Sequence, residues 1–340
     1  MTDAYAKSGV NISEATRAVD LMKTAVKSTH DARVIAGVGA FSGIIDVSSL
    51  RGMTAPVLVA STDGVGTKTK IAAQFNRWDG IGVDIVNHGI NDILCQGARP
   101  LFFMDYIAAS KLEAEVVAAI VSSMAGACRA ANCVILGGET AEMPGVYHAG
   151  ELDVAGTIVG VLERDKIIDG SKVQVGDALL VFPSNGLHTN GYSLARKTLE
   201  HLDWIEARTD LNGVSISHAL LETHTSYLEP VTKLQNTGIE IRALAHITGG
   251  GLWDNVPRVL PEDLSAIFSR GSWPVPAIFN LILEQGQISE RDAFHALNMG
   301  AGMVAVIPQD QLLQALEILP GHVFAAGEIR VRAGDAVVLE

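Results

Sequence analysis

The residues best suited to chemistry lie in the stretch Ser61–Lys70, which reads Ser-Thr-Asp-Gly-Val-Gly-Thr-Lys-Thr-Lys. Gly64 and Gly66 allow the backbone to adopt positive φ angles and to approach a ligand closely. Successive backbone N–H groups in such a turn form an anion-binding concavity, to which Lys68 adds a positive charge. Asp63 supplies a carboxylate, through which divalent cations commonly meet phosphates in proteins. The stretch predicts a metal–polyphosphate site, and the alternative is a turn made of ordinary turn residues.

Two apolar runs lead into chemically similar segments. Val57–Ala60 precedes the stretch above and predicts a buried strand. Cys133–Leu136 predicts a second buried strand, which ends in two glycines followed by Glu139. Two such strands within one domain, each ending in glycines and an acid, are more than the amino-acid composition would produce by chance.

Residues 80–96 predict a helix whose two sides differ in composition. One side is apolar and consists of Val83, Val86, Ile90, Ile93 and Leu94. The other side carries short acids, amides and a histidine, namely Asp84, Asn87, His88, Asn91 and Asp92. Lysine, arginine and glutamate, the usual residues of a solvated helix face, do not occur on it. The polar side is therefore predicted to face a metal or ligand, and a merely solvated face is the alternative.

A glycine-rich loop precedes these elements. It contains Gly37, Gly39 and Gly43, and a short strand carrying Asp46 follows it. Taken alone, such a loop is more often a simple turn than a phosphate-binding loop.

The second half of the chain offers a further candidate site. The predicted strand Asp177–Phe182 leads through a turn into Leu187-His-Thr-Asn-Gly-Tyr-Ser193 and then into a helix. A strand, a polar loop and a helix N-terminus together suit an anion or substrate. His188 is a candidate acid or base within this loop, and the alternative is a hydrogen-bonded structural histidine. The glycines of His246–Gly251 predict another possible phosphate-binding loop or only a tight connection.

Length and composition bound the fold. A chain of 340 residues is too long for one ordinary core, and the polar segment Arg164–Lys172 predicts a boundary between domains 1–170 and 171–340. An apolar content of 48% with 34 glycines predicts the α/β (α+β) class. We expect an N-terminal mixed sheet with helices and a C-terminal sheet flanked by helices.

Charge and cysteine usage restrict the partners. A net charge of −13 argues against nucleic acid or an anionic membrane surface as a general partner. No apolar run reaches the length of a membrane span. The three cysteines, Cys95, Cys128 and Cys133, have no zinc-ligand spacing and predict buried free thiols in a reducing compartment. A cytoplasmic location is therefore expected.

Taken together, these stretches resemble the phosphoribosylformylglycinamidine cyclo-ligase (AIR synthetase) family. The resemblance extends from about residue 5 to the last strand, and each motif is weak alone whereas their order and separation are specific. The motifs are Gly37–Gly43, Ser61–Lys68, Val86–Asp92, Gln96–Tyr106, Gly137–Gly145, Gly186–Ser193, His246–Gly251 and Asn298–Gly302.

The resemblance implies a homodimer in which the N-terminal sheets of both chains pack together and ATP binds near that interface. It also implies Mg2+ and the conversion of formylglycinamidine ribonucleotide (FGAM) and ATP to 5-aminoimidazole ribonucleotide, ADP and phosphate in purine biosynthesis. The family's mechanism is pictured as phosphorylation of the formamide oxygen followed by attack of the amidine nitrogen.

The resemblance also implies roles for particular residues. The magnesium-associated acids would be Asp63, Asp92 and Glu139, together with Asp46. The nucleotide contacts would be Asp63, Gly64, Gly66, Thr67 and Lys68, with Gly37, Gly39 and Gly43 in a closing loop. The catalytic residues would be His188, Asn190 and Lys68. One departure lies near the start, where Asn11 stands in place of the family's usual Asp, which puts any metal or nucleotide role of that position in doubt.

Relatives with the same ATP-binding plan are the alternatives. A selenophosphate synthetase would carry a reactive Cys or selenocysteine ahead of the glycine-rich loop, and Cys95 is the first cysteine here. A thiamine-monophosphate kinase would lack the Leu187–Ser193 match, and a hydrogenase-maturation relative would end in a cysteine rather than in Glu340. An FGAM synthetase would need a far longer chain. A catalytically silent dimeric nucleotide-binding protein would have lost the acids or His188, all of which are present.

Overall fold

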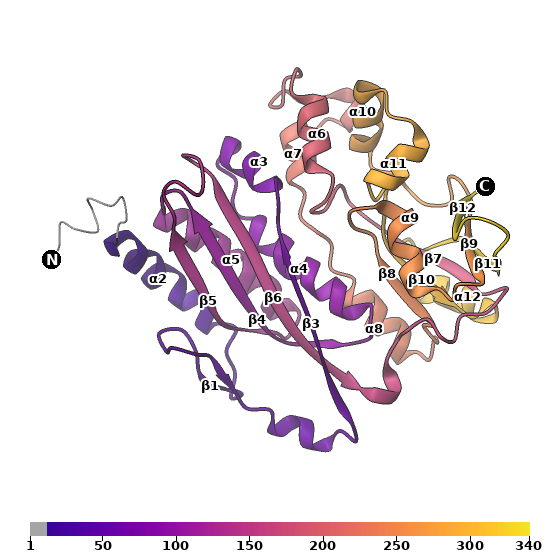
Figure 1. Cartoon of the computed structure of the whole chain (residues 1–340), viewed down its shortest axis with the longest axis horizontal. Coiled ribbons are helices and arrows are strands. Elements are labelled where there is room, and N and C mark those ends of the chain that lie inside the picture. The colour runs from indigo at the N-terminus through magenta and orange to yellow at the C-terminus, as the bar shows by residue number, and fades with distance from the viewer. Residues whose placement is uncertain (1–11) are drawn as a thin grey trace. The chain divides into compact units, whose positions relative to one another are not determined.

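The computed structural model describes residues 12–340, so Asn11 lies outside the described residues. The chain divides into two compact units (Figure 1). Unit 1 comprises the residues up to Ile93 together with Ala98–Lys166, and unit 2 comprises Leu94–Gly97 together with Ile167–Glu340.

Unit 1 is built on a four-stranded mixed sheet. Its strands lie in the order β3 (Pro56–Gly64), β6 (Leu152–Glu163), β4 (Arg99–Ala109) and β5 (Val134–Glu142). The pairs β3/β6 and β6/β4 are antiparallel, whereas β4/β5 is parallel. A bulge interrupts the β4/β5 pairing, because Phe103 lies opposite Ile135 and the next residue lies opposite Gly137.

Helices cover one face of this sheet. The long helices α4 (Ile81–Leu94) and α5 (Ala114–Ala130) lie behind it in Figure 1. Helix α2 (Ile12–Lys27) packs against α5, and α3 (Lys68–Phe75) follows directly on the turn after β3. The predicted helix over 80–96 is therefore confirmed within two residues at each end.

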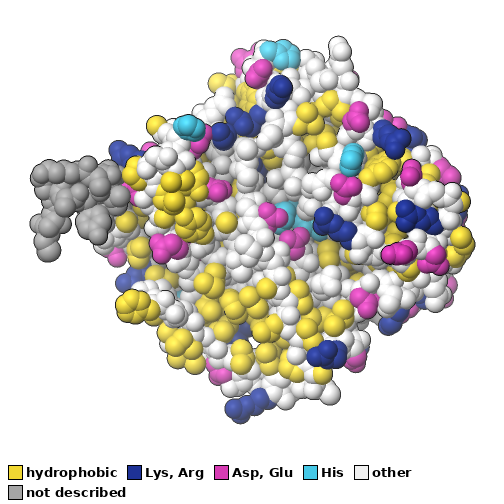
Figure 2. All heavy atoms as spheres, in the orientation of Figure 1, with side chains coloured by type: hydrophobic (Ala, Val, Ile, Leu, Met, Phe, Trp, Pro, Cys, Tyr) yellow, Lys and Arg dark blue, Asp and Glu magenta, His cyan; other side chains and the backbone are white. Residues whose placement is uncertain are grey.

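The opposite face of the sheet is open and carries exposed apolar side chains. In Figure 2, hydrophobic side chains gather over β3, β6 and β4. Leu58, Met104 and Tyr106 are 63%, 41% and 36% exposed. The prediction that Val57–Ala60 forms a buried strand was thus half wrong: the strand exists, but β3 is an edge strand with one face open. An apolar run does not reveal whether a second layer covers it.

The acids of the two glycine-containing segments were predicted to follow their strands. In the structure they belong to the strands themselves. Asp63 is the penultimate residue of β3, and Glu139 lies in the middle of β5. Strand β5 continues through Gly137 and Gly138 because the neighbouring strand β4 supplies ladder partners as far as Glu142. Glycine weakens a strand but does not end one that has a paired neighbour.

A small hairpin precedes the sheet. Strands β1 (Val34–Ala36) and β2 (Ile44–Ile45) pair antiparallel, and the glycine-rich loop joins them. The short 3-10 helix η1 (Ser48–Gly52) leads from the hairpin toward β3.

Unit 2 contains a six-stranded sheet in the order β12-β9-β11-β7-β10-β8. Strands β12 and β9 run parallel, and the other neighbours are antiparallel. The strands are β7 (Ala178–Pro183), β8 (Ala243–His246), β9 (Leu264–Phe268), β10 (Ala301–Ile307), β11 (Phe324–Val331) and β12 (Val337–Leu339). Every residue of β10 is buried, which places this strand in the middle of the core.

Helices flank the sheet of unit 2, as predicted. They are α6 (Tyr192–Leu199), α7 (Ile216–Leu221), α8 (Leu228–Asn236), α9 (Gly251–Asn255), α10 (Ala277–Gly286), α11 (Glu290–Ala296) and α12 (Leu312–Ile318). Side chains of α8 and α12 pack with those of β7, β8 and β10 in one apolar cluster. Within residues 12–340, no helix has both the length and the apolar character needed to span a membrane. All three cysteines are free thiols, as predicted, but only Cys128 and Cys133 are buried, whereas Cys95 is partly exposed.

Candidate functional site

The first cluster of unit 1 joins the end of β3 to α4. The Nε2 atom of His88 lies 2.9 Å from a carboxylate oxygen of Asp63 and 3.6 Å from one of Asp92. The hydroxyl of Ser61 donates a hydrogen bond to Asp92 at 2.7 Å. Asp63 also accepts the Gly64 backbone N–H at 2.6 Å. The polar side of α4 is therefore directed at the strand and is not solvated.

Electrostatics favour the charged forms of Asp63 and His88. The hydrogen bond from His88 lowers the pKa of Asp63 and outweighs the effect of burial. Burial disfavours the charged form of His88, yet the hydrogen bond to Asp63 and the nearby charge of Asp92 raise the pKa of its imidazole. Burial alone would raise the pKa of Asp63 and lower that of His88. Both pKa values shift the other way because the two groups are in contact.

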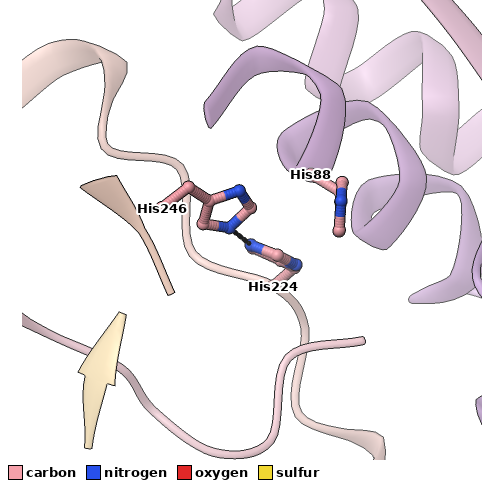
Figure 3. Close-up of side chains that lie close together, drawn as sticks. All are labelled: His88, His224 and His246. Carbon is pink, nitrogen blue, oxygen red and sulfur yellow. Dashed lines mark hydrogen bonds between the residues drawn. The ribbon is translucent and has the colours of Figure 1, made fainter. Parts of the chain in front are cut away.

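The donor atoms of the cluster suit a divalent cation. One atom from each of Asp63, His88 and Asp92 lies within 4.8 Å of the others. Mg2+ prefers carboxylate oxygens and retains several waters, so two acids at a half-exposed strand end match its requirements. His88 projects from α4 (Figure 3), and its hydrogen bond orients Asp63.

The turn after Asp63 holds a buried ion pair. The ammonium of Lys68 lies 2.8 Å from Asp84 on α4, and both side chains are fully buried. Gly66 has a φ of +68°, which allows the chain to turn directly into α3. Thr67 precedes α3, and the hydroxyl of Thr69 donates to the Gly66 carbonyl at 2.9 Å. Lys68 thus fastens the turn to α4, instead of reaching freely into solvent.

The two other predicted metal-associated acids lie elsewhere in unit 1. Asp63, Gly156, Asp105 and Gly138 occupy one row across the four strands. Three strand spacings separate the ends of this row, which is about 14 Å. Glu139 adjoins Gly138 on β5, so this acid and Asp63 lie at opposite edges of the sheet.

Asp46 is exposed and accepts a hydrogen bond from the Ser48 backbone N–H at 2.7 Å. Its hydrogen bonds to Ser48 lower the pKa of this carboxyl. Asp46 thus belongs to the turn that opens η1, and no described cluster of potential metal ligands includes it.

The glycine-rich loop borders a cavity of about 470 Å³, which its three predicted glycines help to line. A Cβ atom on Gly43 would lie 2.4 Å from the Leu136 side chain, and one on Gly37 would lie 2.6 Å from His30. The loop can therefore lie against Leu136 of β5 only with glycine at position 43, whereas a side chain at position 37 would require the His30 ring to move. Asp105 and Glu139 also line the cavity.

The candidate site of unit 2 centres on His188. Its side chain is 2% exposed, and its backbone φ is +60°. The ring stacks on His224 with centroids 4.1 Å apart, and its Nε2 lies 3.5 Å from the Thr225 backbone nitrogen. A Cβ atom on Gly302 would lie 1.7 Å from the Tyr227 hydroxyl and 3.0 Å from His188, so only glycine leaves room for both rings.

A second pair of histidines extends this cluster. The Nε2 atoms of His224 and His246 lie 3.1 Å apart and share a hydrogen bond (Figure 3). The Nδ1 of His224 lies 3.4 Å from the hydroxyl of Thr189. Burial raises the pKa of Tyr227, whose hydroxyl donates to the Pro183 carbonyl at 2.9 Å. The imidazoles of His188, His224 and His246 and the phenol of Tyr227 therefore form one cluster.

The loop itself is held by Asn298. Its amide donates to the Gly186 carbonyl at 2.9 Å, and its carbonyl oxygen accepts from Ser184 at 2.8 Å and from the Gly300 backbone N–H at 3.0 Å. Asn190 lies on the same loop, with its side-chain oxygen 3.4 Å from the position of a Cβ on Gly249. The predicted glycine segments 246–251 and 298–302 thus lie beside the His188 loop.

Several residues of these clusters were missed as individual candidates. His88 was recognised only as part of a polar helix side, and Asp105 was not assigned a role although an acid within an apolar strand is itself a signal. His224 lies in Glu222-Thr-His-Thr, a segment without periodicity or motif, so only the tertiary fold brings it to His188.

Comparisons with known proteins cover both halves of the chain. Residues 30–162 match the family model "AIR synthase related protein, N-terminal domain", and residues 174–340 match the corresponding C-terminal domain model. A phosphoribosylformylglycinamidine cyclo-ligase from Desulfatibacillum aliphaticivorans is 45% identical over 97% of this chain and 96% of that protein. Another from Alkaliphilus metalliredigens (strain QYMF) is 44% identical over 98% of this chain and 97% of that protein.

Among solved structures, the fold is similar to that of the hydrogenase maturation protein HypE in complex with ATP. The TM-score is 0.70 at 18% identity, over 96% of this chain and 91% of that chain. At this identity the likeness concerns the fold alone.

The buried Lys68–Asp84 pair should be essential to the stability of unit 1. In the Asp84→Asn variant, a buried ammonium loses its carboxylate, and we expect a loss of about 3–5 kcal/mol in the free energy of unfolding. Urea unfolding followed by circular dichroism measures this loss. Asp210→Asn, which breaks an exposed pair with Arg208, is the control and should change little. Equal free energies of unfolding for the two variants would show that the buried pair stabilises the protein no more than an exposed pair does.

Proposed function

We infer that this chain, which belongs to the phosphoribosylformylglycinamidine cyclo-ligase family, is the enzyme that closes the imidazole ring of FGAM at the expense of ATP. The observation that carries this conclusion is the 45% identity to a named cyclo-ligase over nearly the whole length of both proteins. The reaction belongs to purine biosynthesis, and the free cysteines support a cytoplasmic location.

The chemistry explains why two kinds of site are needed. An amide oxygen is a poor leaving group, so the formamide oxygen of FGAM first takes the terminal phosphoryl group of ATP and releases ADP. The amidine nitrogen then attacks the formyl carbon, loses a proton, and expels the oxygen as phosphate. The first step depends on holding ATP in line with the oxygen, and the second on removing a proton.

The nucleotide would be held by unit 1. Asp63 and Asp92 would bind Mg2+, which would neutralise phosphate charge when bound. Gly64, Gly66 and Thr67 would present backbone N–H groups to the phosphates. Lys68 is paired with Asp84 in this structure, so we propose that it holds the turn in place beneath the phosphates.

The substrate would meet the His188 loop of unit 2. His188 would accept the proton that the amidine nitrogen loses, and Asn190 would hydrogen-bond to the substrate. Stacking on His224 holds the ring of His188 in one orientation, and the positive φ constrains its backbone. A fixed orientation supports a role in proton transfer, which depends on precise geometry.

We further propose a homodimer with a composite nucleotide site. One ion cannot be bound by both Asp63 and Glu139 of a single copy, because the two lie at opposite sheet edges, about 14 Å apart by strand spacing. A two-fold axis parallel to the strands would place β3 of one copy over β5 of the other. The exposed apolar residues Leu58, Met104 and Tyr106 on the open sheet face support such packing.

Incubation of the protein with FGAM, ATP and Mg2+ tests the function directly. We expect ADP, phosphate and 5-aminoimidazole ribonucleotide in equal amounts, measured by a coupled ADP assay beside a colour test for the aminoimidazole. Reactions without FGAM are the control for plain ATP hydrolysis. Binding of ATP without FGAM-dependent ADP release would mean that the acceptor is another compound.

Replacement of His188 by alanine should separate binding from chemistry. We expect ATP affinity, measured by calorimetry, to remain nearly unchanged while turnover falls by about 10²-fold or more, the scale of a lost acid–base group. His201→Ala removes an exposed histidine of the same unit and is the control. Near-normal turnover of His188→Ala would remove His188 from the mechanism.

The open sheet face should mediate the dimer. Sedimentation at micromolar protein should give the mass of a dimer for the unmodified chain and of a monomer for Met104→Glu, because a charge in an apolar interface is costly. Val331→Glu adds the same charge at an exposed position of unit 2 and should leave the dimer intact. A monomeric unmodified chain would contradict the proposed packing.

A further inference from the structure

A buried histidine outside the recognised motifs, His224, supports the ring of His188. Its side chain is 1% exposed, and its ring stacks on that of His188 with an angle of 22° between the two planes. His224 lies between α7 and α8, in a segment without helix or strand. Because such segments are the more mobile parts of a fold, a side chain on one of them needs external contacts if it is to hold a neighbour in place.

The backbone on both sides of His224 is fastened by the side chain of Asn185. The amide nitrogen of Asn185 donates to the Thr223 carbonyl at 2.9 Å, and its amide oxygen accepts from the Thr225 hydroxyl at 3.1 Å. Asn185 itself lies in the turn that leads from β7 to His188. One amide therefore holds the segment of His224 and the loop of His188 together.

The imidazole of His224 is fixed by contacts at both of its nitrogens. Its Nε2 lies 3.1 Å from the Nε2 of His246, and its Nδ1 lies 3.4 Å from the Thr189 hydroxyl (Figure 3 shows the first contact). The last side-chain torsion of a histidine is otherwise only loosely restricted. Partners at two nitrogens define the plane of the His224 ring, and the stacked ring of His188 lies close to parallel with it.

His246 connects this arrangement to the core of unit 2. It is the last residue of β8 and pairs with Met303 of β10, every residue of which is buried. A hydrogen bond between two imidazole nitrogens needs one N–H donor and one unprotonated acceptor, so at most one of the rings of His224 and His246 is charged. The sheet thus fixes His246, and His246 fixes the ring plane of His224.

The backbone of His188 also requires support from its surroundings. Its φ of +60° lies in the left-handed region, which is unfavourable for residues other than glycine. Such a conformation persists only where the surrounding structure holds it, and positions of this kind are concentrated at functional sites. The stack on His224 supplies part of that support.

We propose that His224 is a positioning residue for ring closure, which aligns the imidazole of His188 with the proton that the amidine nitrogen loses. This inference rests on the proposed function, because it takes His188 as the base. His224 acts on turnover only through His188. Without the stacked ring, the imidazole of His188 can turn away from the proton, and misplacement of a reacting group by about 1 Å can lower a rate by about 10²-fold.

A double-mutant cycle tests this route. His188→Ala, His224→Ala and the variant with both changes are compared with the unmodified protein at saturating FGAM and Mg-ATP. We expect His224→Ala to lower kcat by about 10-fold or more, with the KM for ATP unchanged. In the His188→Ala background, the same change should have no further effect. A residue that only supports the fold would lower kcat by the same factor in both backgrounds, and that result would overturn the proposal.

Two further variants separate the stacked ring from the hydrogen bond. His224→Phe keeps a flat ring but has no nitrogen, whereas His224→Gln places an amide near the Nε2 position and has no ring. Because the ring face is what contacts His188, the kcat of His224→Phe should exceed that of His224→Gln. An equal or reversed order would show that the stack does not matter, and would contradict the proposal.

The control is His201→Ala, which removes an exposed histidine of the same unit and should retain the kcat of the unmodified protein. Thermal unfolding shows whether each variant is folded. If His224→Ala is not, His224→Gln takes its place in the cycle with the same expected result, because it also lacks the stacked ring.

The outcomes separate this inference from the proposed function. If the unmodified protein converts FGAM and His188→Ala is slow, but the effects of the two substitutions multiply, this inference fails alone. If His188→Ala turns over normally, the role of His188 and this inference fail while the cyclo-ligase activity stands. If the unmodified protein converts no FGAM, the proposed function and this inference fail together.

Discussion

The fixed spacing of strands in the sheet of unit 1 is the constraint on which the rest of the account depends. Hydrogen-bonded strands lie about 4.8 Å apart, and this spacing cannot stretch without breaking the ladder. It places Asp63 at one edge and Glu139 at the other, with Asp105 between them. A single copy thus holds three acids in three separate environments, and their different roles follow from that separation.

The environments are set by what each strand packs against. Asp63 meets the polar side of α4, where His88 keeps it ionised, and the buried Lys68–Asp84 pair fixes the turn that follows. Asp105 lies on β4, where it lines the cavity beneath the glycine-rich loop. In unit 2 the His188 loop is held by Asn298 and backed by His224. Rigid support of this kind holds the functional side chains of a site in a fixed geometry.

The sequence predicted most of the framework and only part of the site. Helix α4 and strand β7 follow from local sequence patterns, and the family resemblance was confirmed by the comparisons. The exposure of β3 and the place of Glu139 inside β5 were not predictable, because they depend on neighbouring layers and strands. The same holds for His224, which no motif marks and which reaches His188 only through the fold.

The composite nucleotide site is tested most directly by mixing two inactive variants, Asp63→Asn and Glu139→Gln, after subunit exchange. If two copies complete one site, half of the mixed population carries both changes in different copies, and each such dimer retains one intact site. The account predicts that the mixture recovers about a quarter of the unmodified activity in FGAM conversion. A mixture that stays as inactive as its two components would show that each copy contains its whole site, and would contradict the account.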